Sequence, residues 1–230
     1  MKILLTGATG YIGQRLLPLL VEAGHDVVCL VRDARRFTVP PGLRGRLTVV
    51  QADLLRPATL HALPPDIDAA YYLVHSMSGH DRDFFRAEQQ SARHFTEYLN
   101  RTSCRQVIYL SGIANDRALS VHLRSRKAVE RVLAKAERAA LTVLRASIII
   151  GSGSASFEII RDLVEKLPLM VTPRWLNSRC QPIGIRDVMH YLTGVLGLEA
   201  SFGRTFDIGG PDVLTYRQML LELARARGYR

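Results

Sequence analysis

The feature that most constrains the fold is a glycine-rich stretch between an apolar run and an amphipathic segment at the start of the chain. Residues 2–6 read KILLT, which is typical of a buried strand, and residues 11–23 carry apolar side chains at helical spacing. Between them lies GATGYIG, at residues 7–13. Glycines at such a junction allow a tight turn, and the helix N-terminus offers N–H groups and the positive end of a dipole to an anion. The sequence therefore predicts a pyrophosphate-binding turn.

We predict that the residues of this turn bind NAD(P). Glycine lets the backbone approach a diphosphate closely, and the flanking strand and helix supply the context that a lone glycine triplet lacks. The alternative is a relic turn that keeps its glycines and binds no nucleotide. The residues assigned to the cofactor here are Gly7, Thr9, Gly10, Tyr11, Ile12 and Gly13.

Apolar runs and helical patterns alternate along most of the chain. Long amphipathic helices are expected at 81–100 and 120–139. The expected strands lie at residues 2–6, 26–31, 47–51, 68–74, 106–111 and 141–145. This alternation is typical of βαβ units and a parallel sheet, so we predict an α/β fold.

After residue 145 the pattern becomes less regular. The elements expected there are a helix at 156–167, a helix after Ile185, a short strand at 205–208 and a helix from Thr215. We therefore expect an NAD(P)-binding domain over 1–150 and a small C-terminal ligand lobe over 151–230, packed at the carboxyl ends of the strands. The chain stops directly after its last helix, as a fragment of a longer protein would.

The residues after the second strand favour one form of the cofactor. Folds of this type that prefer NAD place an acidic side chain at the end of that strand, where it holds the ribose 2′-hydroxyl. Here the position is Val31, followed by Arg32, with Arg35 and Arg36 close behind. Because an arginine can pair bidentately with a 2′-phosphate, we expect NADP(H) to be preferred, with NAD(H) as the alternative. A solvated basic face would look the same.

Residues after the third and fourth strands are assigned to the same crevice. Asp53, with Leu54 beside it, is placed to reach the adenine amino group or to cap the following turn. Val74, His75 and Ser76 follow the fourth strand, where the carboxyl edge of the sheet meets the cofactor. A polar turn before a helix is the alternative for these three residues.

Several motifs along the chain are shared with one superfamily. They are TGATGYIG at the start, LVRD after the second strand, ADL after the third, YLSG at the fifth, LRAS at the sixth, and QPIGIRDV and FDIGGPD further on. In these motifs the chain resembles the short-chain dehydrogenase/reductase superfamily, in its atypical NmrA-like and epimerase-like NAD(P)-binding branch. The resemblance implies a Rossmann-type doubly wound parallel sheet of strand order 3-2-1-4-5-6, with substrate bound by the C-terminal lobe.

The chain departs from that superfamily at the catalytic residues. Active members carry a Tyr and a Lys four residues apart on the helix after the fifth strand, and matching RSRKAVERVL places His122 and Arg126 there. His122 could supply a proton near neutral pH while Arg126 grips the ribose, or HLRSRK could be only the solvated start of a helix. Ser111 matches the superfamily's catalytic hydroxyl, or is an ordinary strand-end serine.

The composition limits the other classes of function. The formal net charge is +10, from 31 Lys and Arg against 21 Asp and Glu spread along the chain, and no zinc finger or recognition-helix signature is present. Nucleic acid is therefore an unfavoured partner, and an anionic membrane surface has no specific support. Three cysteines without metal-ligand spacing predict no metal site, and with the absence of a signal-peptide core they predict a soluble cytoplasmic protein.

Two hypotheses for function follow. The first is an NAD(P)(H)-binding oxidoreductase-type protein that transfers hydride to a small carbonyl or quinone. The second is a non-catalytic redox sensor or assembly factor that binds the dinucleotide. The absence of the superfamily's Tyr and Lys is the reason to retain this hypothesis. A basic nucleic-acid-associated protein is a weaker third. The sequence leaves the small organic ligand and the oligomeric state open.

Overall fold

The structure is a computed structural model of residues 1–230. It describes all residues except 40–41, 44, 76–80, 114–120, 167–173 and 229–230. Of residues 81, 82, 84, 121, 122 and 174 it describes only the backbone.

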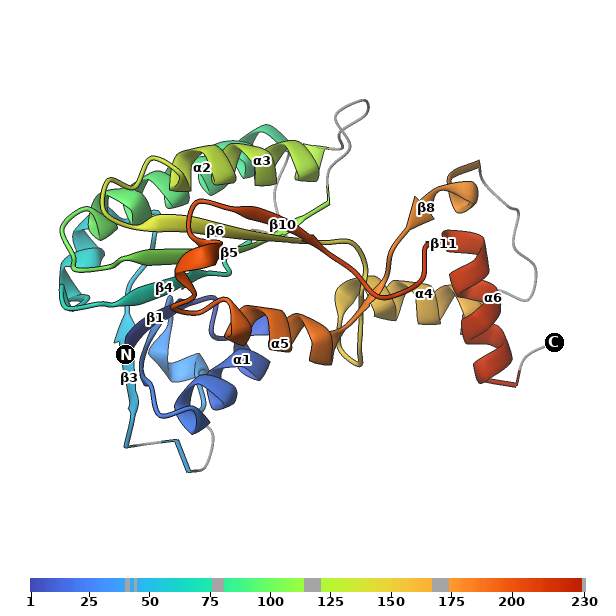
Figure 1. The fold of residues 1–230 in the computed structure, drawn as a ribbon, viewed down its shortest axis with the longest axis horizontal. Coiled ribbons are helices and arrows are strands. Elements are labelled where there is room, and N and C mark those ends of the chain that lie inside the picture. The colour runs from blue at the N-terminus through green and yellow to red at the C-terminus, as the bar shows by residue number, and fades with distance from the viewer. Residues whose placement is uncertain (40–41, 44, 76–80, 114–120, 167–173, 229–230) are drawn as a thin grey trace. The chain divides into compact units, whose positions relative to one another are not determined.

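The main feature is a seven-stranded sheet of order β10-β6-β5-β4-β1-β2-β3 (Figure 1). Its strands are β1 Lys2–Thr6, β2 Asp26–Val31, β3 Leu47–Gln51, β4 Ala69–Tyr72, β5 Gln106–Gly112, β6 Ala140–Ala146 and β10 Thr205–Ile208. The pairs from β3 to β5 are parallel. The predicted Rossmann-type order 3-2-1-4-5-6 is confirmed, with β10 added beside β6.

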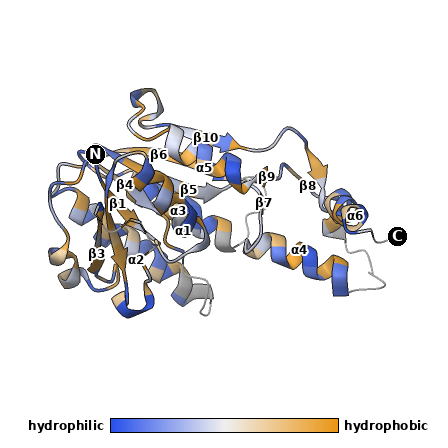
Figure 2. Cartoon of the chain, turned by 90° about the horizontal axis from the view of Figure 1, so that it is seen from below, coloured by the Kyte–Doolittle hydropathy of each residue, from blue (hydrophilic) through white to orange (hydrophobic). Residues whose placement is uncertain are grey.

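Helices cover both faces of this sheet, which makes it doubly wound. Helix α1 (Tyr11–Glu22) lies on one face, and α2 (Asp81–Leu99) and α3 (Val121–Leu133) lie on the other (Figure 1). The strands carry the apolar residues, and the outward helix faces are hydrophilic (Figure 2). Aromatic rings fill the α2 side: the Tyr72 ring centroid lies 5.0 Å from that of Phe95 and 5.8 Å from that of Tyr109.

The chain divides into two compact units. The first consists of Met1–Arg145 with Tyr191–Phe206, and the second of Ala146–His190 with Asp207–Arg230. The sequence-based division into an NAD(P)-binding domain over 1–150 and a ligand lobe over 151–230 is a statement about function, and it stays a prediction.

The second unit has a small core of its own. Its elements are β7 (Ile149–Ile150), α4 (Ala155–Lys166), η3 (Arg174–Asn177), β8 (Arg179–Cys180), β9 (Ile183–Gly184), most of α5 (Ile185–Gly194), β11 (Leu214–Thr215) and α6 (Tyr216–Ala226). The pair β7–β9 is parallel and β11–β8 is antiparallel. The buried residues are Ile148, Ile160, Leu176, Met219 and Leu220.

Residues 191–206 belong to the first unit, and buried hydrogen bonds connect them to the rest of it. The Gln106 amide nitrogen donates to the Val195 carbonyl at 2.8 Å, and the Gln106 amide oxygen accepts from the Gly197 N–H at 2.8 Å. The Tyr71 hydroxyl donates to the Leu192 carbonyl at 2.8 Å. These contacts explain why the strand expected at 205–208 in the late lobe lies instead at the edge of the main sheet.

The predicted elements match the structure except near their ends. The fourth strand, expected over 68–74, is only Ala69–Tyr72, and the helix expected over 120–139 ends at Leu133, where Ala136 N–H bonds three residues back to the Leu133 carbonyl. The helices of the described residues include none that is long and apolar enough to cross a membrane.

Candidate functional site

The turn between β1 and α1 is built around three glycines whose missing side chains leave room for backbone. Gly7 has φ +69°, and a Cβ there would stand 2.5 Å from the Leu73 carbonyl oxygen at the end of β4. A Cβ on Gly13 would overlap the Gly7 carbonyl oxygen. Gly10 N–H bonds the Gly7 carbonyl at 2.9 Å and closes the turn. Gly7 and Gly13 are therefore required by the fold itself.

The turn leaves the start of α1 open toward an anion. Gly10 occupies the N-cap with φ −82° and ψ 167°, and no side chain caps the helix. Thr9 and Gly10 are exposed, while Tyr11 and Ile12 are half-buried, and the Arg15 guanidinium lies 3.9 Å from the centroid of the Tyr11 ring. First-turn N–H groups at an uncapped helix end are suited to phosphate oxygens. The geometry of these residues fits a pyrophosphate.

The arginines that follow β2 differ in their ion pairing. Val31 is buried and Arg32 is exposed. Arg35 is paired with Asp33, whose carboxylate accepts from the Arg35 Nε at 3.0 Å, the Arg35 Nη2 at 3.1 Å and the Arg35 backbone N–H at 3.0 Å. This pairing holds the pKa of Asp33 below its usual value. The first carboxylate after the end of β2 is therefore already occupied, and Arg32 has no ion pair with a described residue.

Asp53, after β3, caps the turn that follows it. Its carboxylate accepts from the Leu55 N–H at 2.9 Å, and its own N–H donates to the Thr59 hydroxyl at 2.9 Å. Leu54 is buried, and its carbonyl lies 2.6 Å from Nδ1 of His94. The structure thus shows the capping role for Asp53, while its reach to the adenine stays a prediction.

A series of polar side chains in contact with one another lies at the carboxyl ends of β4 and β5. Val74 and His75 are half-buried there, and Ser76 lies outside the described residues. His75 Nε2 is 3.2 Å from Nη1 of Arg126, and His75 Nδ1 is 3.7 Å from a carboxylate oxygen of Glu88. The other Glu88 oxygen accepts a hydrogen bond from the Ser125 hydroxyl. Burial lowers the pKa of His75, Glu88 raises it and Arg126 lowers it further.

Two buried hydroxyls adjoin this series from β5. Ser111 is 3% exposed and Tyr109 is fully buried, and the hydroxyls of both form no hydrogen bond with the described residues. Burial raises the pKa of Tyr109, while Arg126 and Ser111 act in the opposite direction. Gly112 comes next, and a Cβ there would stand 3.5 Å from Cδ of Arg126. The missing side chain therefore lets Arg126 lie over the end of β5.

The structure brings together two of the three predicted catalytic residues. Ser111 and Arg126 both lie at the end of β5, and His75 joins them. The backbone of His122 lies in α3, but its side chain is outside the described residues. The sequence interpretation missed Glu88, although a carboxylate in register with Ala92 and Phe95 on the inward face of a helix was a detectable signal.

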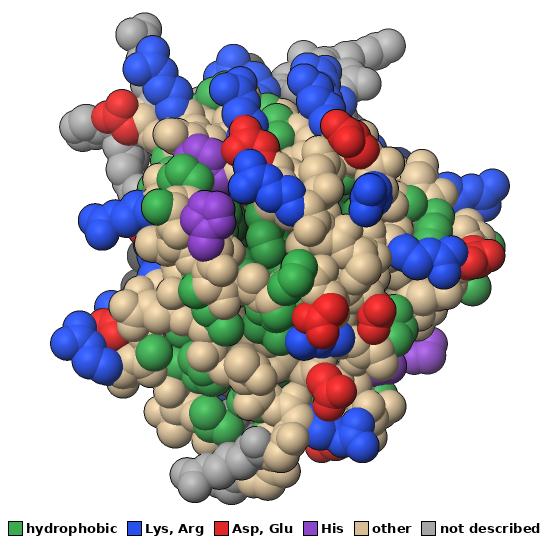
Figure 3. Space-filling view, turned by 90° about the vertical axis from the view of Figure 1, so that its left-hand side faces the viewer, with side chains coloured by type: hydrophobic (Ala, Val, Ile, Leu, Met, Phe, Trp, Pro, Cys, Tyr) green, Lys and Arg blue, Asp and Glu red, His purple; other side chains and the backbone are tan. Residues whose placement is uncertain are grey.

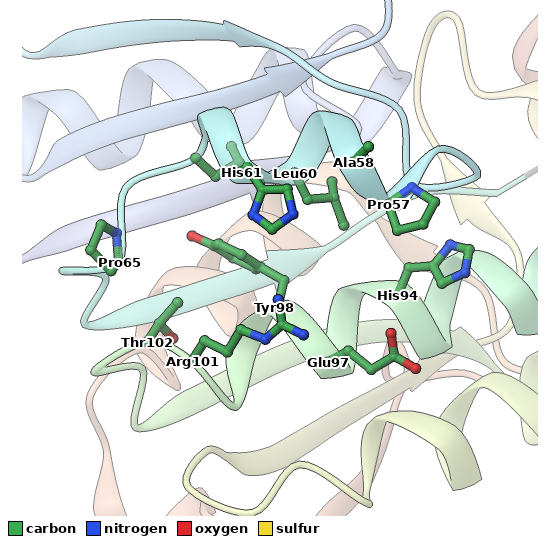
Figure 4. Close-up of a pocket in the computed structure, with 11 residues that line it drawn as sticks. Pro57, Ala58, Leu60, His61, Pro65, His94, Glu97, Tyr98, Arg101 and Thr102 are labelled. Carbon is green, nitrogen blue, oxygen red and sulfur yellow. The ribbon is translucent and has the colours of Figure 1, made fainter.

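Two cavities lie away from these residues. One of about 480 Å³ is lined by a short helical segment, η2 (Pro57–Ala62), and by α2, with His61, Tyr98 and Arg101 in its wall (Figure 4). A second lies at the amino ends of β1, β2 and β3. Neither is lined by a predicted site residue. The described residues hold no group of three His, Cys, Asp or Glu that could bind a metal ion.

Cations do not gather into one patch on the face drawn in Figure 3. Lys and Arg side chains are scattered there among Asp and Glu, with apolar and histidine side chains between them. This face offers no continuous basic track of the kind that follows a nucleic-acid backbone.

The sheet, the glycine turn and the open helix start define a Rossmann-fold protein of the dinucleotide-binding class. The model of a family described as NAD(P)H-binding matches residues 7–149. The chain belongs to this NAD(P)H-binding family.

Two curated relatives and one solved structure illustrate the similarity. The rice divinyl chlorophyllide a 8-vinyl-reductase (Oryza sativa subsp. indica) is 27% identical over 228 residues, covering 91% of this chain and 54% of the relative. The photosystem II assembly factor Ycf39 of Synechocystis is 35% identical over 69 residues, covering 30% of this chain and 21% of the relative. The chain thus spans about half the length of the reductase.

The fold comparison agrees with this assignment. The UDP-glucuronic acid 4-epimerase of Bacillus cereus, solved in complex with NAD, superposes with a TM-score of 0.78 at 20% identity, covering 99% of this chain and 83% of that chain. At this identity the likeness shows the fold alone, which is the Rossmann-type fold expected from the motifs.

Proposed function

We propose that this chain is an NADP(H)-dependent oxidoreductase that reduces a small organic carbonyl or quinone. The observation that carries the proposal is the polar group of His75, Ser111 and Arg126, which lies at the carboxyl ends of β4 and β5. In an open α/β sheet this edge is where the ligand crevice lies. The glycine turn after β1 opens at the same edge, because β1 and β4 are parallel neighbours.

Each residue has a role in this proposal. The bound dinucleotide supplies the hydride. The N–H groups at the start of α1 hold its pyrophosphate, while Val74 and His75 border the ribose. Arg126 and Ser111 contact the substrate oxygen or the ribose, and His122 supplies the proton. The second unit serves as the ligand lobe in this proposal.

The NADP(H) preference rests on Arg32. Its guanidinium is exposed and has no ion pair with a described residue, whereas the nearby Asp33 is occupied by Arg35. A 2′-phosphate finds a cation there, and a 2′-hydroxyl lacks its usual acceptor.

We expect Arg32→Ala to weaken NADPH binding by roughly 10- to 100-fold, as the loss of a charge-assisted pair costs about 1.5–3 kcal/mol. NADH affinity should stay within about twofold. Isothermal titration calorimetry measures both. The matched control is Arg36→Ala, which removes an exposed arginine four residues further on. Equal losses of NADPH and NADH affinity in Arg32→Ala would contradict the assignment.

The reaction is tested by NADPH oxidation with a panel of quinones and aldehydes. The proposal predicts turnover that Ser111→Ala and Arg126→Ala lower by about 100-fold at saturating NADPH. The same loss in His122→Ala would identify the proton donor. Binding of both the oxidised and the reduced cofactor without turnover of any substrate would instead identify the second function below.

A non-catalytic NAD(P)H sensor or assembly factor is the second candidate. The absence of the superfamily's Tyr and Lys favours it, as does the similarity of 69 residues to an assembly factor. Such a protein needs the glycine turn but not the polar group at β4 and β5. Variants of Ser111 and Arg126 would then change stability at most, and cofactor binding would stay as in wild type.

We place the protein in the cytoplasm. Cys29 and Cys104 are buried free thiols, and burial raises the pKa of each to about 12, so neither forms a reactive thiolate. Thiols of this kind suit a reducing compartment. Cell fractionation of the tagged chain tests the placement, and recovery with the membrane pellet after a high-salt wash would contradict it.

A further inference from the structure

The series of polar side chains at the ends of β4 and β5 is buried among apolar and aromatic groups. Glu88 is 5% exposed and Ser125 is fully buried, and Tyr72 and Tyr109 pack nearby in the core. The His75 ring centroid is 6.0 Å from that of Tyr109. A buried carboxylate is costly unless it is hydrogen-bonded. The buried Glu88 carboxylate therefore needs hydrogen-bond donors around it.

The direction of the hydrogen bonds follows from the chemistry of the groups. A guanidinium can only donate, so the 3.2 Å contact between Arg126 and His75 makes Nε2 of His75 an acceptor. In a neutral imidazole the hydrogen then sits on Nδ1, which faces the Glu88 carboxylate at 3.7 Å. Ser125 donates to the other carboxylate oxygen. The donors thus point in one direction, from Arg126 to His75 and from His75 toward Glu88, which also accepts from Ser125.

At the other end of this series of polar side chains is Arg126, whose side chain lies over Gly112. The nearby hydroxyls of Ser111 and Tyr109 form no hydrogen bond with the described residues. A long side chain over a glycine has several rotamers available, and fixing one of them costs conformational entropy. The bond to His75 selects the rotamer that keeps the guanidinium at the end of β5.

We propose that Glu88 and His75 are positioning residues: the Glu88 carboxylate fixes the Nδ1–H tautomer of His75, and the bare Nε2 holds Arg126 at the end of β5. The inference deepens the proposed function, on which it rests for the role of Arg126 toward substrate. It adds a consequence for pH, because protonation of Nε2 places two donors opposite each other and releases the arginine.

The groups that face His75 define this pH response. Glu88 faces it from α2, Arg126 from α3 and Tyr109 from β5. Tyr109 stays neutral, Glu88 favours the imidazolium and Arg126 opposes it. Burial lowers the pKa of His75 below 6.5, so the neutral form predominates at pH 7 and Arg126 is released only under more acidic conditions.

The tautomer of His75 is measured by ¹⁵N NMR of the whole chain with labelled histidine, and His75→Gln assigns the signals. At pH 7 we expect a protonated Nδ1 and an unprotonated Nε2. Glu88→Leu should shift the proton to Nε2, whereas Glu88→Gln, whose amide oxygen still accepts, should keep it on Nδ1. A wild-type Nε2–H tautomer would overturn the proposal, as would a tautomer that is unchanged in Glu88→Leu.

A second variant tests the same pairing if Glu88→Leu does not fold. Arg126→Leu removes the donor and leaves Glu88 in place, so the pKa of His75 should rise in an NMR pH titration. An unchanged or lower pKa in Arg126→Leu would overturn the pairing. Neither NMR measurement needs cofactor or substrate, so their outcome is independent of whether the chain is a reductase.

The functional consequence is measured as NADPH oxidation with menadione as the probe quinone. We expect kcat, measured at saturating NADPH, to fall by roughly 10- to 100-fold in His75→Leu. His75→Gln, which retains an acceptor, should restore most of kcat and abolish the loss of kcat on acidification. Equal kcat in His75→Leu and wild type, or a pH profile unchanged in His75→Gln, would overturn the positioning role.

Discussion

Single residues decide whether the β1–α1 turn can form. Gly7 needs both a left-handed backbone and the absence of a Cβ, since the Leu73 carbonyl lies where that atom would be. The sequence allowed these glycines to be predicted because their spacing and flanking elements are local features. The helical register of Glu88 indicates that it faces inward, but its partners come from α3 and from the residues after β4, and only the folded chain brings these together.

At Gly7 the substitution Gly7→Ala should lower the free energy of unfolding by about 3 kcal/mol, because it combines an unfavourable φ with steric overlap. Gly45→Ala is the matched control: no atom lies within 4 Å of a Cβ there and its φ is not positive. It should change stability by less than about 0.5 kcal/mol. Urea denaturation followed by circular dichroism measures both, and equal stabilities of the two variants would refute the reason given for Gly7.

At the scale of elements, the hydrophobic periods predicted most strands and helices to within a residue or two, and the largest difference is the end of α3. The helix expected over 120–139 ends at Leu133, and residues 134–139 form a turn that leads into β6. Helix α3 is tied to β6 by a bidentate pair, in which Arg145 Nη2 lies 2.6 Å and Arg145 Nε 3.1 Å from the Glu130 carboxylate oxygens. Such pairing between distant segments carries no local sequence signal.

Breaking that pair should therefore matter more than breaking an exposed one. We expect Glu130→Ala to lower the free energy of unfolding by about 2 kcal/mol, since the Glu130 side chain is only 11% exposed and Arg145 loses its carboxylate partner. Glu199→Ala removes the partner of Arg105 in a pair that is 74% and 75% exposed, and should cost less than about 0.5 kcal/mol. Thermal melts that rank the two variants in the opposite order would be inconsistent with this account.

At the scale of the whole molecule, the sequence predicted the sheet order through family resemblance but not the return of residues 191–206 to the first unit. That return depends on buried polar contacts of Tyr71 and Gln106, which look like ordinary strand residues in the sequence. The sequence predicts a partly separate lobe over the C-terminal third of the chain, and β10 from this third pairs with β6 in the main sheet.

A fragment of residues 1–150 should consequently be much less stable than the whole chain. It would lose the hydrogen bonds of the Gln106 amide and the Tyr71 hydroxyl to the carbonyls of residues 191–206, together with the apolar contacts of that segment, and it would expose the β6 edge. Differential scanning calorimetry should show a markedly lower transition temperature or none. A cooperative transition at the temperature of the whole chain would show that 1–150 is a self-sufficient domain.

The most direct test of the central claim is calorimetric titration of NADPH into the wild-type chain and into Gly10→Asp. Aspartate is a favourable N-cap at this extended backbone position, and its Cβ would stand 3.2 Å from the Gly7 carbonyl oxygen, so the variant should fold with a small adjustment of the turn, while its carboxylate occupies the anion site at the start of α1. We predict saturation near one equivalent for wild type and affinity at least ~100-fold weaker, about 2.7 kcal/mol, for Gly10→Asp. Absence of binding to wild type, or equal binding to both, would contradict the account.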